Sequence, residues 1–428
     1  MAQHIDSTSV PVSRHAWKVW IKFALVSLIF FQITAATFTS LGVALPFMIE
    51  EMSWSWSSAG LGFSVLSFMV GIASRIPSWT LRVLGTRATF GIGGAVMAGG
   101  FVLLATTSGL YQFLIGAGLA GLGYTLCAVV PGVDVINQWL PHRRSLAIGI
   151  YMTIGGLGGV AGPLIVTNVV ASTGSWRMHW WLMAASIATL AVAAIIFLRS
   201  PEKRPDDPES DLAAEKHSDS VFQTRFDWHF KDVLRTPQYY IIVAATTMTF
   251  LGGVTTNSWA VTHMGNIGIV ISVAAGALSA HALINSLSRA FGGALATRID
   301  PKWLLATGLL AAIIGMMALA AADNMTMIVV FAIGEGYGFG MCLFSTAVLL
   351  VNYFGPKEAP KTMGTMYLIS TVAMLGPVTS GYVADKFGGF DNVFRSYAVL
   401  LAICLFAVVL MKPPIPPEEK RRTISDEC

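Results

Sequence analysis

The chain has 428 residues, of which 54% are hydrophobic and only 12% are charged, with a formal net charge of +4. Soluble proteins carry about 25% charged residues, so this composition excludes an ordinary soluble enzyme and predicts an all-α membrane protein. The small net charge gives no case for nucleic-acid binding.

Twelve apolar stretches recur along the chain, each near the roughly twenty residues that a helix needs to cross a bilayer. The first stretch is too long for the core of a signal peptide, so we expect it to remain as the first membrane helix. The expected spans are 23–48, 57–80, 88–107, 111–139, 146–171, 179–198, 238–262, 266–293, 303–322, 325–354, 362–384 and 393–411.

A polar stretch divides the twelve spans into two groups of six. Residues 199–235 contain sixteen of the chain's fifty Lys, Arg, Asp and Glu residues, which is typical of a solvated linker. The predicted organisation is a cytoplasmic tail at 1–22, a six-helix bundle at 23–198, a cytoplasmic linker at 199–237, a second six-helix bundle at 238–411 and a cytoplasmic tail at 412–428.

The distribution of Lys and Arg predicts the orientation in the membrane. With a cytoplasmic N-terminus, eight of these residues fall in short inner loops and three in outer loops, as the positive-inside rule requires. The inner set is Arg82, Arg87, Arg143, Arg144, Arg298, Lys302, Lys357 and Lys361, and the outer set is Arg177, Lys386 and Arg395. We therefore expect a multi-pass protein of the plasma (inner) membrane with both termini in the cytoplasm, functional as a monomer.

The two groups of spans repeat each other at an offset of 215 residues. This offset carries Cys127, Asn137 and Pro141 onto Cys342, Asn352 and Pro356, and it carries Gly121, Gly123 and Gly149 onto Gly336, Gly338 and Gly364. The repeat predicts two pseudo-symmetric six-helix bundles. Transporters place their substrate between two such repeats, so the pattern also predicts a transport function.

One arginine stands inside the eighth span. An arginine at the centre of a membrane helix costs about 2.5–3.5 kcal/mol, so Arg289 is expected to face a polar cavity and a partner. His281, Asn285 and Arg289 are spaced by four residues, which places them on one helix face. A guanidinium holds a carboxylate through two parallel hydrogen bonds, so this stripe predicts a binding site for an organic anion.

A second arginine, Arg75, lies in the second span. The repeat places it on Ala290, next to Arg289, so the two arginines occupy nearly pseudo-symmetric positions. Two facing cations suit an inorganic anion or a dicarboxylate as well as a monocarboxylate, and an interfacial structural role for Arg75 also stays open.

Two acidic residues, Asp134 and Glu335, fall inside the expected spans. Glu335 lies about ten residues into the tenth span, roughly 15 Å from its start and therefore near the middle of the bilayer. A carboxyl group there is a candidate for proton coupling, with a structural hydrogen bond or ion pair as the alternative. Asp134 lies near the cytoplasmic end of the fourth span, where it is predicted to form a structural or gating pair near Arg82 and Arg87.

The cysteines predict neither disulfides nor a metal site. Cys127, Cys342 and Cys404 lie in apolar spans, and Cys428 is the last residue. The glycine clusters lack the preceding strand and the Lys-Ser/Thr pair of a phosphate-binding loop. We therefore expect no cofactor and no metal.

The loops after the second and eighth spans resemble the cytoplasmic signature of the major facilitator superfamily, Gly-x-x-x-Asp-Arg-x-Gly-x-Arg. The second copy is Gly293–Lys302, and the first keeps Gly85 and Arg87 but has Ser78 and Arg82 in place of its Gly and Asp. This resemblance implies the twelve-helix major facilitator fold, with Arg298 in a gating or structural role. Because both copies lack the aspartate, the ion pair that locks the gate in this family is not expected here.

Within this superfamily, Trp139–Gly149 and Leu375–Asp385 resemble the monocarboxylate and oxalate:formate transporters. Those families hold the substrate carboxylate with an arginine in the eighth helix, a position that Arg289 matches. The resemblance is incomplete, because Asn285 stands where an aspartate is expected and the first and eleventh spans have no lysine. Gln32 and Tyr124 fall where these families place polar and aromatic contacts.

These observations predict a secondary active transporter of a small organic anion, either a mono- or a dicarboxylate, that works by alternating access. Proton symport, exchange and uniport stay open. One alternative follows from Arg75-Ile76-Pro77, which resembles the nitrate/nitrite transporters that clamp their anion between arginines of the second and eighth helices. A second alternative is proton-driven efflux of amphipathic compounds, in which Glu335 would bind a cationic substrate. The spans contain no nucleophile–base pair or metal cluster, so we expect no enzyme activity.

Overall fold

The computed structural model describes residues 16–140, 144–198, 222–224, 226, 228–296, 298–355 and 358–415, which are almost entirely helical and contain no strand. The elements are α1 (Ala16–Ala36), α2 (Phe38–Met52), α3 (Trp56–Ile72), η1 (Ala73–Arg75), α4 (Ile76–Val83), α5 (Gly85–Ala105), α6 (Leu110–Cys127), α7 (Val129–Trp139), α8 (Arg144–Thr173), α9 (Trp176–Phe197), α10 (Phe230–Val233), α11 (Pro237–Asn266), α12 (Ile271–Leu295), α13 (Pro301–Ala321), α14 (Met325–Phe354), α15 (Ala359–Ser370), η3 (Thr371–Leu375), α16 (Gly376–Phe387) and α17 (Asp391–Leu410).

The structure confirms twelve segments that are long and apolar enough to cross a membrane. Their ends differ from the expected spans by five residues at most, and the largest difference is at the eighth segment. That helix begins at Ile271 rather than at residue 266, because Gly268 adopts a φ of 91° and forms the preceding turn. Most of the predicted linker, most of both tails and the loop residues Pro141, Arg143 and Lys357 lie outside the described residues.

Four of the expected spans are interrupted helices rather than continuous ones. The first breaks between α1 and α2, the second at η1, the fourth between α6 and α7, and the eleventh at η3. Pro77, Pro131 and Pro377 lie within the first three residues of the segments that follow three of these breaks. Proline cannot donate to the preceding turn but is tolerated at a helix start, which explains why the axes change there.

The duplication is visible in individual contacts. The fourth span, Leu110–Trp139, and the tenth, Met325–Phe354, have bounds that differ by 215 at both ends. Cys127 Sγ donates to the carbonyl of Phe90 at 3.7 Å, and Cys342 Sγ donates to that of Leu305 at 4.0 Å. Since all these pairs share one offset, the two bundles are structural repeats.

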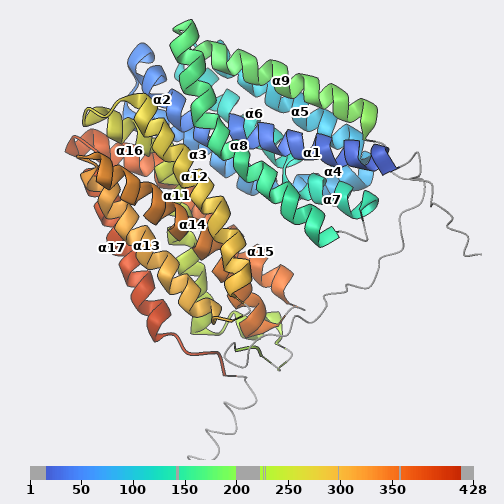
Figure 1. The fold of residues 1–428 in the computed structure, drawn as a ribbon, viewed down its shortest axis with the longest axis vertical. Coiled ribbons are helices and arrows are strands. Elements are labelled where there is room, and N and C mark those ends of the chain that lie inside the picture. The colour runs from blue at the N-terminus through green and yellow to red at the C-terminus, as the bar shows by residue number, and fades with distance from the viewer. Residues whose placement is uncertain are drawn as a thin grey trace, which may run out of the picture.

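The two bundles are α1–α9 and α11–α17, and they lie side by side at one end of the molecule (Figure 1). At that end α2 packs against α11 and α3 packs against α16, while α8 packs against α12 further along. A Cβ atom on Gly42 would lie 1.8 Å from the Asn257 carbonyl oxygen, and one on Gly60 would lie 2.4 Å from that of Pro377. Glycine is therefore needed there for the backbones of the two halves to approach.

The opposite end is not joined in this way. α4 and α7 make their contacts mainly with elements of their own half, and the bundles diverge toward α7 and α15 (Figure 1). We call the end with α2 and α16 the closed end, and the end with α7 and α15 the open end. The two halves are thus in contact at the closed end and separate toward the open end (Figure 1).

Asp385, at the C-terminal end of α16, joins the two halves at the closed end. Its carboxylate accepts the backbone N–H groups of Trp56 at 3.0 Å and Ser57 at 2.9 Å. These N–H groups form the first turn of α3 in the other half, where helix donors lack an intrahelical partner and the helix dipole attracts a negative charge. We call this arrangement the Asp385 latch.

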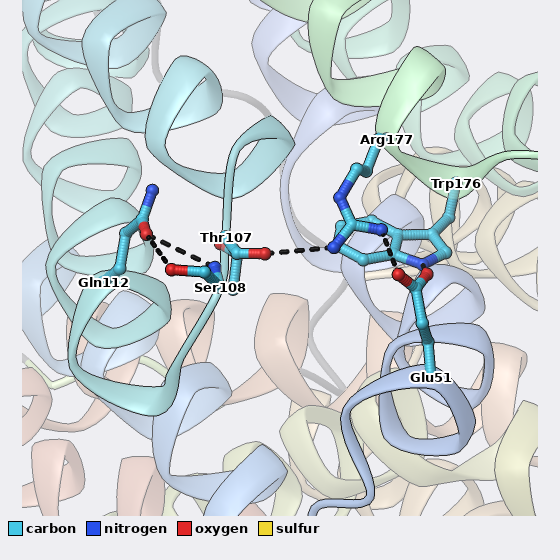
Figure 2. A network of polar contacts seen from close by, with 6 residues as sticks. All are labelled: Glu51, Thr107, Ser108, Gln112, Trp176 and Arg177. Atoms are coloured by element: carbon cyan, nitrogen blue, oxygen red, sulfur yellow. Dashed lines mark hydrogen bonds and ion pairs between the residues drawn. The ribbon is translucent and has the colours of Figure 1, made fainter.

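A second polar network joins helices within the N-terminal half at the same end (Figure 2). Glu51 accepts a hydrogen bond from Trp176 Nε1 at 2.6 Å and forms an ion pair with Arg177. The guanidinium of Arg177 also donates to the carbonyl of Thr107 at 3.0 Å. This network ties α2 and the turn before α6 to the start of α9.

Replacing Arg177 with alanine is expected to lower stability by about 1 kcal/mol. The Glu51 carboxylate and the Thr107 carbonyl lose a donor, but the ion pair that is lost is partly exposed to solvent, which limits the cost. The readout is the midpoint of thermal unfolding of the purified protein. Arg395→Ala is the matched control, because Arg395 is exposed and makes no ion pair or hydrogen bond with the described residues. Equal midpoints for the two variants would contradict the assignment.

Candidate functional site

Arg289 lies on α12, and its side chain is exposed although the helix is packed between α8 and α14. The guanidinium has no hydrogen-bond or ion-pair partner among the described residues. It interacts electrostatically with the hydroxyls of Tyr124 on α6 and Tyr367 on α15. Arg289 is therefore an exposed residue whose cation is unpaired among the described residues and lies within electrostatic range of one tyrosine from each half.

His281 and Glu335 are brought together within the C-terminal half. Nε2 of His281 on α12 contacts Oε2 of Glu335 on α14 as an ion pair, and each side chain is only 2% exposed. The imidazole stacks on Phe331 with ring centroids 6.0 Å apart. α13 reaches this site through Gly315, where a Cβ would lie 2.3 Å from the Glu335 backbone nitrogen. The sequence placed both residues in the membrane but did not pair them.

Asn285 packs toward α14, as His281 does, whereas Arg289 is exposed. Its Oδ1 is buried without a hydrogen-bond partner among the described residues, and it lies 2.9 Å from the position of a Cβ on Gly340 of α14. The predicted stripe of three polar side chains is thus divided. His281 and Asn285 pack toward α14, and Arg289 is the exposed member.

Tyr124 and Gln32, both predicted as lining, are placed differently. The ring of Tyr124 packs edge-on against Phe38 at 5.6 Å, and its hydroxyl lies beside Thr34 and within electrostatic range of Arg289. The amide of Gln32 donates to Ser186 Oγ on α9 at 2.6 Å. Tyr124 therefore belongs to the candidate site, while Gln32 ties α1 to α9.

Arg75 is the last residue of η1, and its side chain is exposed. One turn earlier, Gly71 packs against Thr371 of η3, with 3.2 Å between the position of a Cβ on Gly71 and the Thr371 Cγ2. The two arginines thus lie at different contacts between the halves. Arg75 is near the α3–η3 contact, and Arg289 is on the helix that packs against α8.

Asp134 and Arg82 line one cavity of about 460 Å³ near the open end, between α4 and α7. Gln138 donates to Asp134 Oδ2 at 2.6 Å, and Arg82 Nε donates to the Ser78 carbonyl at 3.2 Å. Both residues thus line the same cavity, while the structural or gating pair predicted for Asp134 stays a prediction.

The other two predicted gating residues lie at helix ends. Arg87 donates to the carbonyl of Ile196 at 3.0 Å, which ties the start of α5 to the end of α9. Arg298 lies in the turn after α12. No group of three or more His, Cys, Asp or Glu side chains that could hold a metal occurs in the described part of the chain.

Sequence reasoning missed Tyr367, which lies within electrostatic range of Arg289 although 78 positions separate them in the chain. The sequence did contain a signal for this residue, because Tyr367 is a tyrosine inside the apolar span 362–384, in the same half as Arg289. The pairing of His281 with Glu335 also had a signal, because two ionisable side chains on neighbouring helices of one bundle must each find a partner.

Twelve spans in two repeated bundles are the architecture of a membrane transporter. The family model of the Major Facilitator Superfamily matches residues 25–275 and 242–427, so the chain belongs to this superfamily. These findings confirm the fold that the signature loops predicted.

Curated relatives and a solved structure agree with this assignment. Monocarboxylate transporter 12 of Xenopus laevis is 22% identical over 345 residues, covering 75% of this chain and 73% of the relative. Monocarboxylate transporter 11 of Homo sapiens is 26% identical over 404 residues, covering 88% and 79%. A bacterial homologue of the human lysosomal transporter Spinster, in an inward-facing and unoccupied conformation, shares the fold with a TM-score of 0.74 at 18% identity over 94% of this chain and 99% of that one. The predicted resemblance to the monocarboxylate transporters is confirmed.

Proposed function

We propose that this protein transports a small organic anion, a mono- or dicarboxylate, by alternating access. The observation that carries the proposal is the exposed residue Arg289, which lacks a counter-ion among the described residues and lies within electrostatic range of a tyrosine from each half. An unpaired charge in a membrane protein is costly, and a bound carboxylate removes that cost through two charge-assisted hydrogen bonds. The similarity to two proteins named as monocarboxylate transporters supports the same class of substrate.

In the proposed cycle, the anion enters from the open end and binds Arg289. Neutralising this cation favours the approach of the halves around the substrate, because Tyr124 of the N-terminal half and Arg289 of the C-terminal half then share one ligand. A ligand shifts a conformational equilibrium only through contacts that differ between the two states, and this shared contact is such a difference. With both termini in the cytoplasm of a plasma-membrane protein, as the charge distribution favours, the open end faces the cytoplasm.

We further propose that the His281–Glu335 pair is the site of proton coupling. Two buried ionisable groups in contact can hold a proton as an ion pair or share it in a neutral form, and a change of environment shifts that balance. His281 and Arg289 lie eight residues apart on α12, about 12 Å along the helix axis. A movement of α12 on anion binding would therefore reach both sites.

The test is equilibrium binding to the purified protein of lactate, oxalate, an aromatic carboxylate, nitrate and a lipophilic cation. We expect carboxylate affinity to fall at least tenfold in Arg289→Gln, because one bidentate ion pair is lost. Arg395→Gln, an exposed arginine far along the chain from the site, is the matched control and should bind like the wild type.

The same panel separates the other functions. Binding of nitrate alone, lost in both Arg289→Gln and Arg75→Gln, would replace this proposal with a two-arginine inorganic anion site. Binding of the lipophilic cation, unaffected by Arg289→Gln, would overturn the anion assignment in favour of efflux of amphipathic compounds.

A further inference from the structure

An aromatic wall lies in the C-terminal half, and its member Tyr367 is within electrostatic range of Arg289. Tyr367 of α15 packs against Phe250 of α11 with ring centroids 6.1 Å apart, and Phe250 packs against Phe339 of α14 at 6.3 Å. Phe339 lies over the bare helix face at Gly253, where a Cβ would meet its ring at 2.1 Å. Three helices therefore support one continuous aromatic surface.

Tyr367 is the exposed member of this wall, since Phe250 and Phe339 are both partly buried. Its side chain is 44% exposed, and its hydroxyl interacts electrostatically with Arg289. In the N-terminal half, Tyr124 lies within electrostatic range of the same guanidinium, and its ring packs against Phe38. Each half thus contributes one tyrosine with a phenylalanine behind it.

The internal repeat shows that these two tyrosines are not equivalent positions. The offset of 215 carries Tyr124 onto Phe339, which has no hydroxyl. The hydroxyl of the C-terminal half therefore comes from another helix, α15, and its ring lies beside Phe250 rather than in the place of Phe339. The two faces of the site consequently differ, with more aromatic surface on the C-terminal side.

The chemistry of a carboxylate matches this arrangement. A carboxylate accepts about four hydrogen bonds, so an oxygen pair held by a guanidinium fork keeps a free lone pair on each oxygen. A tyrosine hydroxyl can donate to each of them. An aromatic group attached to the carboxylate would then lie against exposed ring surface, where offset or edge-on contacts are favourable.

We propose that Tyr367 is a specificity-determining residue, whose hydroxyl holds the substrate carboxylate together with Arg289 and whose ring, with Phe250, selects carboxylates that carry an aromatic group. This inference rests on the proposed organic-anion function and narrows its substrate class. It assigns recognition of the head group to Arg289 and the two hydroxyls, and recognition of the organic part to the wall.

The test compares the affinities of phenylacetate and acetate, which share a head group and differ by one ring. The wild type should bind phenylacetate about two- to tenfold more tightly than acetate, as expected for one aromatic contact. Tyr367→Phe keeps the ring and loses the hydroxyl, so both affinities should fall by the same factor, about two- to tenfold. Tyr367→Leu removes the ring and should bring the ratio of the two affinities to about one.

Tyr382→Leu is the matched control, because Tyr382 is 60% exposed on α16 and makes no polar or ring contact with the described residues, so it should keep the wild-type ratio. If the wild type binds both acids and Tyr367→Leu keeps the ratio, Tyr367 does not set specificity and the transport proposal stands. The same conclusion follows if Tyr367→Phe, the conservative variant, weakens neither acid. If the wild type binds neither acid, this inference fails; the proposed function fails with it only if lactate, oxalate and the aromatic carboxylate of the first panel are not bound either.

Discussion

Replacing Glu335 with alanine is expected to destabilise the protein by about 3–5 kcal/mol, the largest effect of any single change considered. The reason is that a buried charge pair stabilises little by itself, while removal of one partner leaves the other buried without compensation. Glu335 and His281 are each only 2% exposed, and neither contacting atom has a further hydrogen bond to the described residues. Unfolding of the purified protein in a denaturant series measures the change.

A double variant separates pairing from simple loss of volume. Glu335→Leu combined with His281→Phe replaces both members with apolar side chains of similar size, so it should be markedly more stable than either single substitution. If Glu335→Ala unfolds like the wild type, the two residues are not a buried pair.

Glu335→Gln tests the proposed role of the same pair in proton coupling. This variant keeps the shape of the side chain and a hydrogen-bonding partner for His281 while removing the titratable carboxyl group. In vesicles, we expect carboxylate transport to continue while carboxylate-driven proton uptake is lost. Proton uptake equal to that of the wild type would assign the pair a structural role only.

Replacing Asp385 with alanine is expected to shift the protein away from the state described here. The variant loses two charge-assisted hydrogen bonds to the first turn of α3, and with them the attraction between a carboxylate and a helix N-terminus. Net contributions of about 1.5–3 kcal/mol for hydrogen bonds to charged groups correspond to at least a tenfold change in the conformational equilibrium. The closed end should therefore open more often.

Thiol labelling at the closed end measures this shift. Ser64 is 3% exposed, and its hydroxyl accepts the backbone N–H of Val378 from the other half at 3.2 Å. A Ser64→Cys substitution should therefore react slowly with a membrane-impermeant maleimide, and about tenfold or more faster when Asp385→Ala is added. Asp391→Ala is the matched control, because it removes a carboxylate near the same end that, among the described residues, pairs with His263 of its own half. Equal labelling rates in the two backgrounds would show that the Asp385 latch does not hold the closed end.

The Asp385 latch also helps to explain why this conformation is closed at the end of α2 and α16. Both signature loops lack the aspartate that the superfamily uses in locking the gate, and Arg82 takes its place in the first copy. At the closed end, by contrast, Asp385 reaches the other half. The closed end thus has a carboxylate contact between the halves, whereas the signature loops lack the corresponding aspartate. This difference favours the conformation that is open at the end of α7 and α15.

The amino-acid sequence by itself determined the number of spans, the duplication and the family. Length and hydropathy suffice for the spans, because a bilayer accepts only helices of about twenty apolar residues that satisfy their own backbone groups. It also singled out Arg289 and Glu335, because ionisable groups inside such helices need a partner or a cavity. Tyr124 was indicated only by the resemblance to the family.

Only the tertiary structure decided which of these groups meet. His281, Asn285 and Arg289 share a helix face in projection, yet residues four apart are displaced by about 40° around the axis. That drift, together with the close approach of α12, α13 and α14 at Gly315 and Gly340, turns His281 toward Glu335 and leaves Arg289 exposed. The meeting of Arg289 with Tyr367, and the joining of the halves through Asp385, depend on which helices pack together and in which conformational state. No periodicity along a single chain records those contacts.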